Sequence, residues 1–66
     1  MTFAERLKEL RTNNGYSMAE LGKMINVSAV TIFNYEKGKI KPFVNTQIQI
    51  AKVFNITVDE LMKEGE

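Results

Sequence analysis

Residues 17–38 decide the fold of this chain of 66 residues, and they read SMAELGKMINVSAVTIFNYEKG. Large apolar residues recur in this stretch at helical spacing, at Leu21, Ile25, Ile32 and Tyr35. Gly22 has no side chain that would keep a neighbouring backbone away, and Asn26 tolerates the left-handed geometry of a tight turn. The spacing therefore predicts two helices that cross steeply over a short turn.

Capping patterns predict where the helices begin. A Ser or Thr followed three residues later by Glu or Gln is the pattern of a capping box, and it occurs at Thr2, Ser17, Thr46 and Thr57. Ser28 is a further candidate, because Val27 before it and Ile32 after it have the spacing of a hydrophobic staple. Gly15 and Gly38 are typical helix ends, since glycine adopts the left-handed conformation without strain. We therefore predict helices at 3–13, 18–25, 29–37, 46–54 and 58–63.

These helices make an all-α fold, a compact five-helix domain over residues 1–66 with a helix-turn-helix at about 18–37. Residues 27–35 are rich in β-branched and aromatic side chains, which favours a strand. Neither alternate set of these residues is consistently apolar, so a helix fits better. Helical periodicity predicts a core of Phe3, Leu7, Leu10, Leu21, Ile25, Ile32, Tyr35, Ile50, Val53, Phe54 and Leu61, with Met62 as a further candidate.

Composition excludes most catalytic chemistry. The chain has neither cysteine nor histidine, which removes zinc sites, redox motifs and the usual Ser–His or Cys–His pairs. No run of apolar residues is longer than two, so we expect neither a membrane span nor a signal peptide. We expect a soluble intracellular domain that is not an enzyme and that uses no cofactor, no metal and no small-molecule substrate.

The net charge of +1 hides an uneven distribution. Residues 1–58 carry eight Lys or Arg against four Glu, whereas residues 59–66 carry four acidic residues against one lysine. Three lysines of the basic part alternate in one short segment, at Lys37, Lys39 and Lys41. Such a triplet is by itself typical of a solvated loop, and it indicates a phosphate-binding surface only beside a helix that reads DNA.

The motifs of the whole chain resemble those of the Cro-type phage repressor family of small transcriptional regulators. The resemblance rests on FAERLKELR at 3–11, GYS at 15–17, AEL at 19–21, VS at 27–28, NYEKG at 34–38, IAKVF at 50–54 and VDEL at 58–61. It implies a five-helix DNA-binding domain that binds a double-stranded operator as a homodimer and regulates transcription, most often as a repressor. It also implies a location in the cytoplasm, on the nucleoid when the protein is bound. The third helix would enter the major groove.

The resemblance also implies roles for individual residues. Ala29, Val30 and Asn34 match the family's base-reading positions, and helical geometry adds Phe33 beside them. Phosphate contacts are implied at Ser17, Met18, Thr31, Lys37, Lys39 and Lys41. Arg11 and Glu36 match an internal ion pair of the family, so we expect a structural role for both.

This sequence departs from the family where specificity is expected. Met18 replaces the usual Gln, and Ala29 and Val30 replace polar readers, so only Asn34 can form a bidentate pair with adenine. One interpretation is that the apolar face reads thymine methyl groups. The alternative is a helix-turn-helix remnant that docks another protein through Met18, Ala29, Val30 and Phe33.

A second apolar group is predicted at Phe43, Val44 and Ile48, before and on the fourth helix. Gln47 stands where the family usually buries Leu, while Ile48 is expected on the outer side. An exposed apolar patch indicates a contact between two copies of the chain. The alternative is a core helix that is slightly rotated relative to its counterparts in the family.

Overall fold

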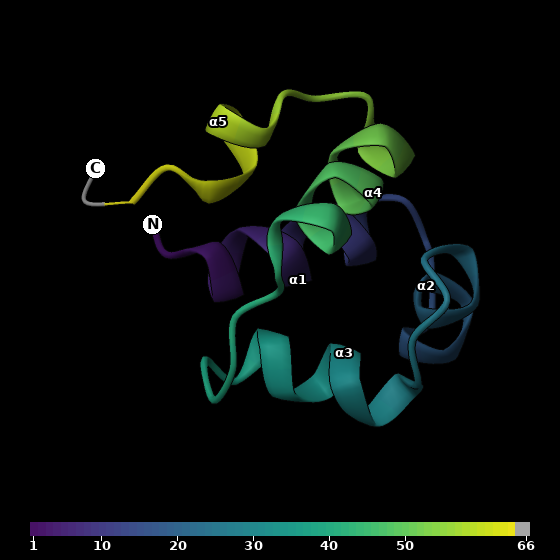
Figure 1. Cartoon of the computed structure of the whole chain (residues 1–66). Coiled ribbons are helices and arrows are strands. Elements are labelled where there is room, and N and C mark those ends of the chain that lie inside the picture. Colours follow the sequence, from purple (N-terminus) through teal and green to yellow (C-terminus); the bar gives the residue numbers. More distant parts are fainter. Residues whose placement is uncertain (65–66) are drawn as a thin grey trace.

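The computed structural model describes residues 1–64, which contain five α-helices and no strand. The helices are α1 (Phe3–Asn13), α2 (Met18–Met24), α3 (Ala29–Glu36), α4 (Val44–Phe54) and α5 (Val58–Met62) (Figure 1). The prediction of an all-α fold is confirmed. Residues 27–35, which could have formed a strand, lie in the turn before α3 and in α3 itself.

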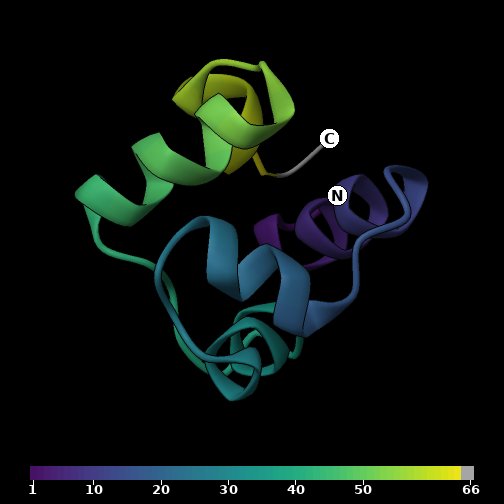
Figure 2. The same ribbon diagram turned by 90° about the vertical axis from the view of Figure 1, so that its right-hand side faces the viewer.

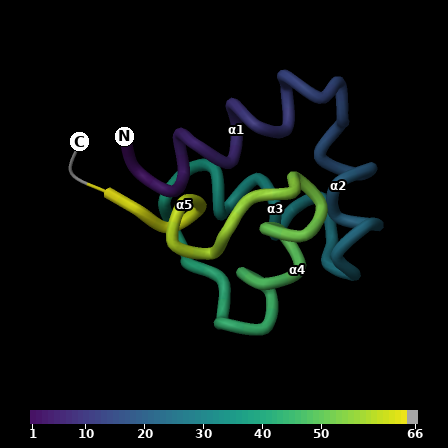
Figure 3. The backbone as a smooth tube through the Cα atoms, turned by 90° about the horizontal axis from the view of Figure 1, so that it is seen from above, coloured from purple at the N-terminus to yellow at the C-terminus, as the bar shows by residue number. Residues whose placement is uncertain are grey.

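The five helices surround one core. Helix α1 packs against α3 and α5, α2 packs against α3, and α4 packs against α5. In Figure 2, α4 and α5 lie on the opposite side of the molecule from α3. Near the start of α1, a guanidinium nitrogen of Arg6 donates a hydrogen bond of 2.8 Å to the carbonyl oxygen of Leu61 in α5, and Figure 3 shows these two helices from above. The core therefore leaves the outer side of α3 free.

The buried core agrees with helical periodicity at most positions. Its members are Phe3, Leu7, Leu21, Ile25, Ile32, Tyr35, Ile50, Ala51 and Leu61. Four predicted core residues are only partly buried against this cluster, namely Leu10, Val53, Phe54 and Met62. Ala51 was not predicted, because a small side chain contributes little to an apolar periodicity even where the backbone itself lies in the core.

Three predicted capping boxes are present, and they begin α1, α2 and α5. In each, the hydroxyl of the cap residue accepts from the backbone N–H of a glutamate, whose carboxylate accepts from the backbone N–H of the cap. The caps are Thr2, Ser17 and Thr57. Ser28 begins α3 as predicted, and its hydroxyl accepts from the backbone N–H of Thr31 at 3.1 Å.

The start of α4 was predicted wrongly. The helix begins at Val44 after the cap residue Phe43, so Thr46 lies inside the first turn and caps nothing. The earlier start gains a backbone bond of 2.9 Å from Gln47 to the carbonyl of Phe43, and the Gln47 side chain donates to Pro42 O at 3.0 Å. The backbone hydrogen bonds of the longer helix outweigh the capping pattern at Thr46. The ends of α2, α3 and α5 come one residue earlier than predicted, within ordinary fraying, and the remaining boundaries agree with the prediction.

Two capping glutamates make stability depend on pH. A hydrogen bond from the backbone of Thr2 lowers the pKa of Glu5, and one from the backbone of Thr57 lowers the pKa of Glu60. When folding lowers the pKa of a carboxylate, the ionised group stabilises the folded chain, and this contribution is complete at pH values above the ordinary pKa of glutamate. This contribution is lost as the pH falls through the lowered pKa, because the folded chain binds protons less readily than the unfolded one.

We therefore expect the melting temperature of the parent to fall on acidification, and to fall less steeply in a Glu5→Gln/Glu60→Gln variant. Glutamine can still accept the cap hydrogen bond but does not titrate. Thermal unfolding followed by circular dichroism between neutral and strongly acidic pH measures the difference. Glu9→Gln is the matched control, because the Glu9 side chain is exposed and caps no helix. Identical pH profiles for parent and double variant would contradict this origin of the acid sensitivity.

Candidate nucleic-acid interface

The outer side of α3 carries the residues that were predicted to read bases. Ile32 and Tyr35 are buried on its inner side, while Val30 on the outer side is 68% exposed and Phe33 is 39% exposed. Ala29 and Asn34 are half-buried. Figure 1 shows α3 along one edge of the molecule, with no other helix beyond it. The structure therefore presents an apolar face with one amide side chain in it.

The turn between α2 and α3 holds these two helices at a fixed angle. Gly22 is buried, and a Cβ atom there would lie 2.5 Å from the carbonyl oxygen of Val27, closer than any real contact. The Val27 N–H in turn donates to the carbonyl of Gly22 at 2.8 Å. Asn26 has a φ of 63°, the left-handed turn conformation that was predicted for it. Only glycine at position 22 allows this approach of the two backbones.

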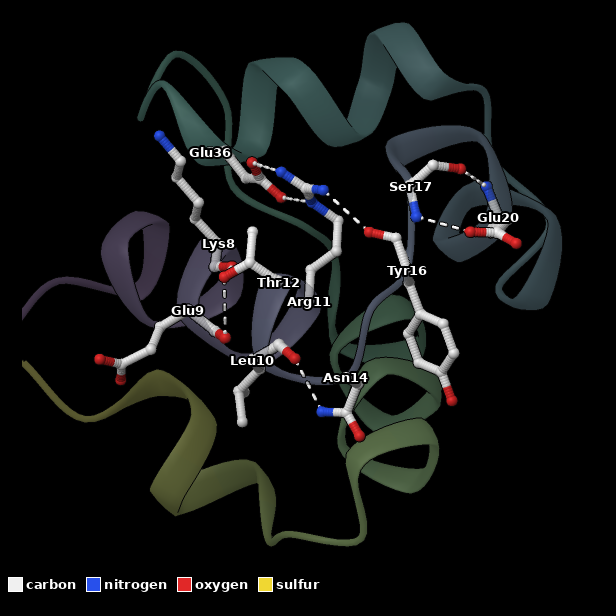
Figure 4. Close-up of polar contacts among 10 residues, drawn as sticks. All are labelled: Lys8, Glu9, Leu10, Arg11, Thr12, Asn14, Tyr16, Ser17, Glu20 and Glu36. Carbon is white, nitrogen blue, oxygen red and sulfur yellow. Dashed lines mark hydrogen bonds and ion pairs between the residues drawn. The ribbon is translucent and has the colours of Figure 1, made fainter.

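Arg11 connects α3 to the rest of the molecule (Figure 4). Its guanidinium donates to both carboxylate oxygens of Glu36, at 2.6 and 3.0 Å, and its third nitrogen donates to the carbonyl of Tyr16 at 2.9 Å. The side chains of Arg11 and Glu36 are only 11% and 3% exposed. Hydrogen bonding to Glu36 raises the pKa of Arg11 further, although burial opposes the rise. The implied ion pair is present and joins the ends of α1 and α3.

The polar groups at the starts of α2 and α3 are already engaged. Ser17 caps α2 as described, and the hydroxyls of Ser28 and Thr31 lie 3.0 Å apart. Met18 is half-buried and packs against the core, so its side chain belongs to the interior as much as to the surface. Of the predicted phosphate contacts outside the lysines, Ser17 and Thr31 keep a hydroxyl oxygen near the surface, and Met18 can offer only its backbone N–H.

The three alternating lysines do not form one cluster. The ammonium groups of Lys37 and Lys39 lie over the ring of Phe33, at 5.4 and 6.0 Å from its centre. The ammonium of Lys41 instead lies 3.6 Å from a carboxylate oxygen of Glu64, which also accepts from the N–H of Phe3 at 3.3 Å. The structure therefore groups two of the lysines with the reading helix and places the third beside the start of α1.

The second apolar group is exposed as predicted. Phe43 is 87% exposed, and Val44 and Ile48 are exposed one helical turn apart on α4. Ile40, which was not predicted, is also exposed in the loop before them. Gln47 is half-buried, turned toward Pro42. The structure thus shows several exposed apolar side chains in the loop before α4 and on α4, apart from the reading face on α3.

Nothing in the described residues suggests a metal or a membrane. Within residues 1–64, no three acidic side chains come close enough together to hold a metal ion. In the same range, no helix has the length and apolar character that crossing a bilayer requires.

Comparison with known proteins places the chain in a family. A helix-turn-helix family model matches residues 7–61. The whole chain aligns with the transcriptional activator BcrR of Enterococcus faecalis at 35% sequence identity and covers 32% of its length. It also aligns with the transcriptional regulator ImmR of Bacillus subtilis at 29% identity and covers 52% of its length. A crystal structure of the P22 c2 repressor with a synthetic operator is similar at a TM-score of 0.91, with 28% identity over 96% of each chain.

The chain belongs to the helix-turn-helix family, and its resemblance to Cro-type repressors is confirmed. It spans about a third of BcrR and about half of ImmR. The similarity therefore concerns one part of each of those two regulators, whereas it covers almost all of the solved P22 c2 chain.

The buried ion pair predicts a strong loss of stability when it is broken on one side. Arg11→Met or Glu36→Met should each cost about 3–5 kcal/mol, because the remaining charge stays buried without its partner. Replacing both by Met should cost much less than the sum of the two single losses. Urea unfolding of the four proteins measures the coupling.

The exposed pair of Lys41 and Glu64 is an internal control for this cycle. Its side chains are 67% and 39% exposed, so Lys41→Met should change stability by at most about 1 kcal/mol. Additive losses for Arg11→Met and Glu36→Met would show that the two residues do not stabilise the chain as a pair.

Proposed function

We propose that this chain is the DNA-binding domain of a small transcriptional regulator and that it binds double-stranded DNA in a sequence-dependent manner, with α3 in the major groove. The observation that carries the proposal is the exposed outer face of α3, held on a rigid helix-turn-helix and free of core contacts. A major groove admits one helix and presents base edges to it. Binding, and not catalysis, is the activity proposed.

The face offers two ways to read bases. The Asn34 amide can donate to N7 and accept from N6 of the same adenine, as a bidentate pair. Ala29 and Val30 offer methyl groups that fit the C5-methyl of thymine, and Phe33 lies at the edge of the same face. The proposed operator is therefore rich in A·T pairs where α3 lies.

Affinity comes from the phosphates in this proposal. The hydroxyls of Ser17 and Thr31 and the backbone N–H of Met18 lie at helix starts, where the helix dipole favours an anion. Lys37, Lys39 and Lys41 supply positive charge beyond the end of α3. Lys41 has to leave Glu64 to do so, at little cost, because the pair is exposed.

We further propose that the domain acts as a homodimer on a two-fold-symmetric operator, in the cytoplasm and on the nucleoid, as a repressor. Support comes from the exposed side chains of Phe43, Val44 and Ile48, which can pair with the same surface of a second copy. The similarity to the operator-bound P22 c2 repressor supports the choice of partner and of repression.

One observation favours a second candidate. Val30 and Phe33 make the outer face of α3 unusually apolar for a DNA reader, and such a face also fits a groove on another protein. In that case the helix-turn-helix is retained as a scaffold and binds a partner chain through Met18, Ala29, Val30 and Phe33.

Selection from a random duplex library distinguishes the two candidates. We expect enrichment of a two-fold-symmetric sequence, and we expect Asn34→Ala to weaken binding to it by about 1–3 kcal/mol and to relax preference at one base pair per half-site. Uracil in place of a contacted thymine should weaken binding without changing its salt dependence. Lys52→Ala is the control, because Lys52 is on α4, which lies on the opposite side of the molecule from α3 (Figure 2). If no sequence is enriched at moderate salt, the protein-docking function replaces DNA recognition.

The dimer is tested through its most exposed residue. Phe43→Ser should leave the fold intact, because the ring is outside the core, and should shift the sedimentation equilibrium toward monomer. Met24→Ser is the matched control, since Met24 is another exposed apolar side chain but lies on α2. A parent chain that is monomeric both free and on its selected duplex would contradict the homodimer.

A further inference from the structure

Phe33 has an unusual position for an exposed aromatic residue. Ile32 and Tyr35 occupy the core side of α3, and Phe33, which is 39% exposed, is not a member of the buried cluster. Two cations lie close to its ring, with the ammonium groups of Lys37 and Lys39 at 5.4 and 6.0 Å from the ring centre. Distances of this size are within the range of cation–π attraction.

The two lysines reach the ring for separate geometric reasons. Lys37 follows Phe33 by four residues, so the two side chains lie on one side of the helix. Lys39 reaches the ring of Phe33 because the turn at the end of α3 folds the chain back. Gly38 has a φ of 74° and donates to Tyr35 O at 3.2 Å, and the Lys39 N–H donates to Asn34 O at 3.0 Å. This pair of bonds is the Schellman motif, which brings the residue after the glycine back against the helix.

The arrangement restrains the lysines while leaving them able to bind. A ring attracts the positive charge of an ammonium group and accepts no conventional hydrogen bond from it. The N–H donors of the lysine therefore remain available for a phosphate oxygen. A lysine that is already held loses less side-chain entropy when it contacts DNA. Lys41 shows the contrast, because its ammonium lies beside Glu64 and not on the ring.

We propose that Phe33 is a positioning residue for DNA binding, which holds Lys37 and Lys39 at the end of α3 in place for two phosphates and reads no base itself. The proposal rests on the proposed function, since it assigns a role within duplex binding. It replaces the direct base contact that helical geometry alone suggested for Phe33.

Phe33→Leu and Phe33→Tyr separate the ring from its apolar character. Leucine keeps an apolar side chain but has no π face, so both lysines become free and lose more side-chain entropy when they contact DNA. We expect duplex affinity to fall about 3- to 10-fold per half-site, which corresponds to part of the ordering cost of two long side chains. The loss should be equal for the selected duplex and for its single-base variants. Tyrosine keeps the ring and should restore the parent's affinity.

The salt dependence gives an independent measure. Lys37→Ala removes a phosphate contact and should reduce the salt slope by about 1 per half-site, whereas Phe33→Leu keeps both charges and should leave the slope unchanged. In a Lys37→Ala/Lys39→Ala background, Phe33→Leu should have no further effect on affinity. An undiminished effect in that background would overturn the proposal, as would a changed base preference in Phe33→Leu, which would make Phe33 a direct reader.

A measurement without DNA tests the contact itself. The ring current of Phe33 should shift the side-chain methylene proton resonances of Lys37 and Lys39, and the shifts should vanish in Phe33→Leu, persist in Phe33→Tyr and be unaffected by the control Phe43→Leu. If the shifts are absent from the parent, the proposal is overturned. If the parent has the shifts but binds no duplex, the proposed function fails and this role with it. If the parent binds a duplex and Phe33→Leu binds equally well, only the role of Phe33 fails.

Discussion

The contact on which the structure most depends is the one between the Arg11 guanidinium and its two acceptors. One planar group bonds the Glu36 carboxylate at the end of α3 and the Tyr16 carbonyl in the loop before α2. It therefore ties together three segments that the small core alone would hold weakly. Because both charges are nearly buried, the pair specifies where α3 lies more than it adds to net stability.

The second constraint is steric and acts at the other end of α3. The contact of Gly22 with Val27 O determines how closely the start of α3 approaches α2, and the left-handed Asn26 redirects the chain between them. With one end determined by an ion pair and the other by a backbone contact, α3 has little freedom to turn about its own axis. Ile32 and Tyr35 then remain inside, and Val30 and Asn34 remain on the outer side.

Charge at the reading helix is arranged locally and cannot be read from the net charge of +1. The ammonium groups of Lys37 and Lys39 lie over the ring of Phe33, and that of Lys41 pairs with the carboxylate of Glu64. An exposed aromatic side chain can thus decide where two cations lie, while a carboxylate near the chain end competes for a third. The proposed affinity for phosphate depends on these placements as well as on the number of lysines.

The sequence by itself determined the features that depend on a few neighbouring residues. The caps at Thr2, Ser17, Ser28 and Thr57 and the turn at Asn26 follow from local hydrogen bonding and backbone sterics, and they were predicted correctly. The start of α4 at Val44 depends on hydrogen bonds of Gln47 to Phe43 and Pro42, which outweigh the capping pattern at Thr46. Tertiary structure alone decided the burial of Ala51 and the packing of Met18 against the core. Tertiary structure also placed the ammonium group of Lys41 beside the carboxylate of Glu64, which is far along the chain. Each of these depends on contacts between distant segments, whose free energy outweighs a local preference and leaves no periodic signal in the sequence.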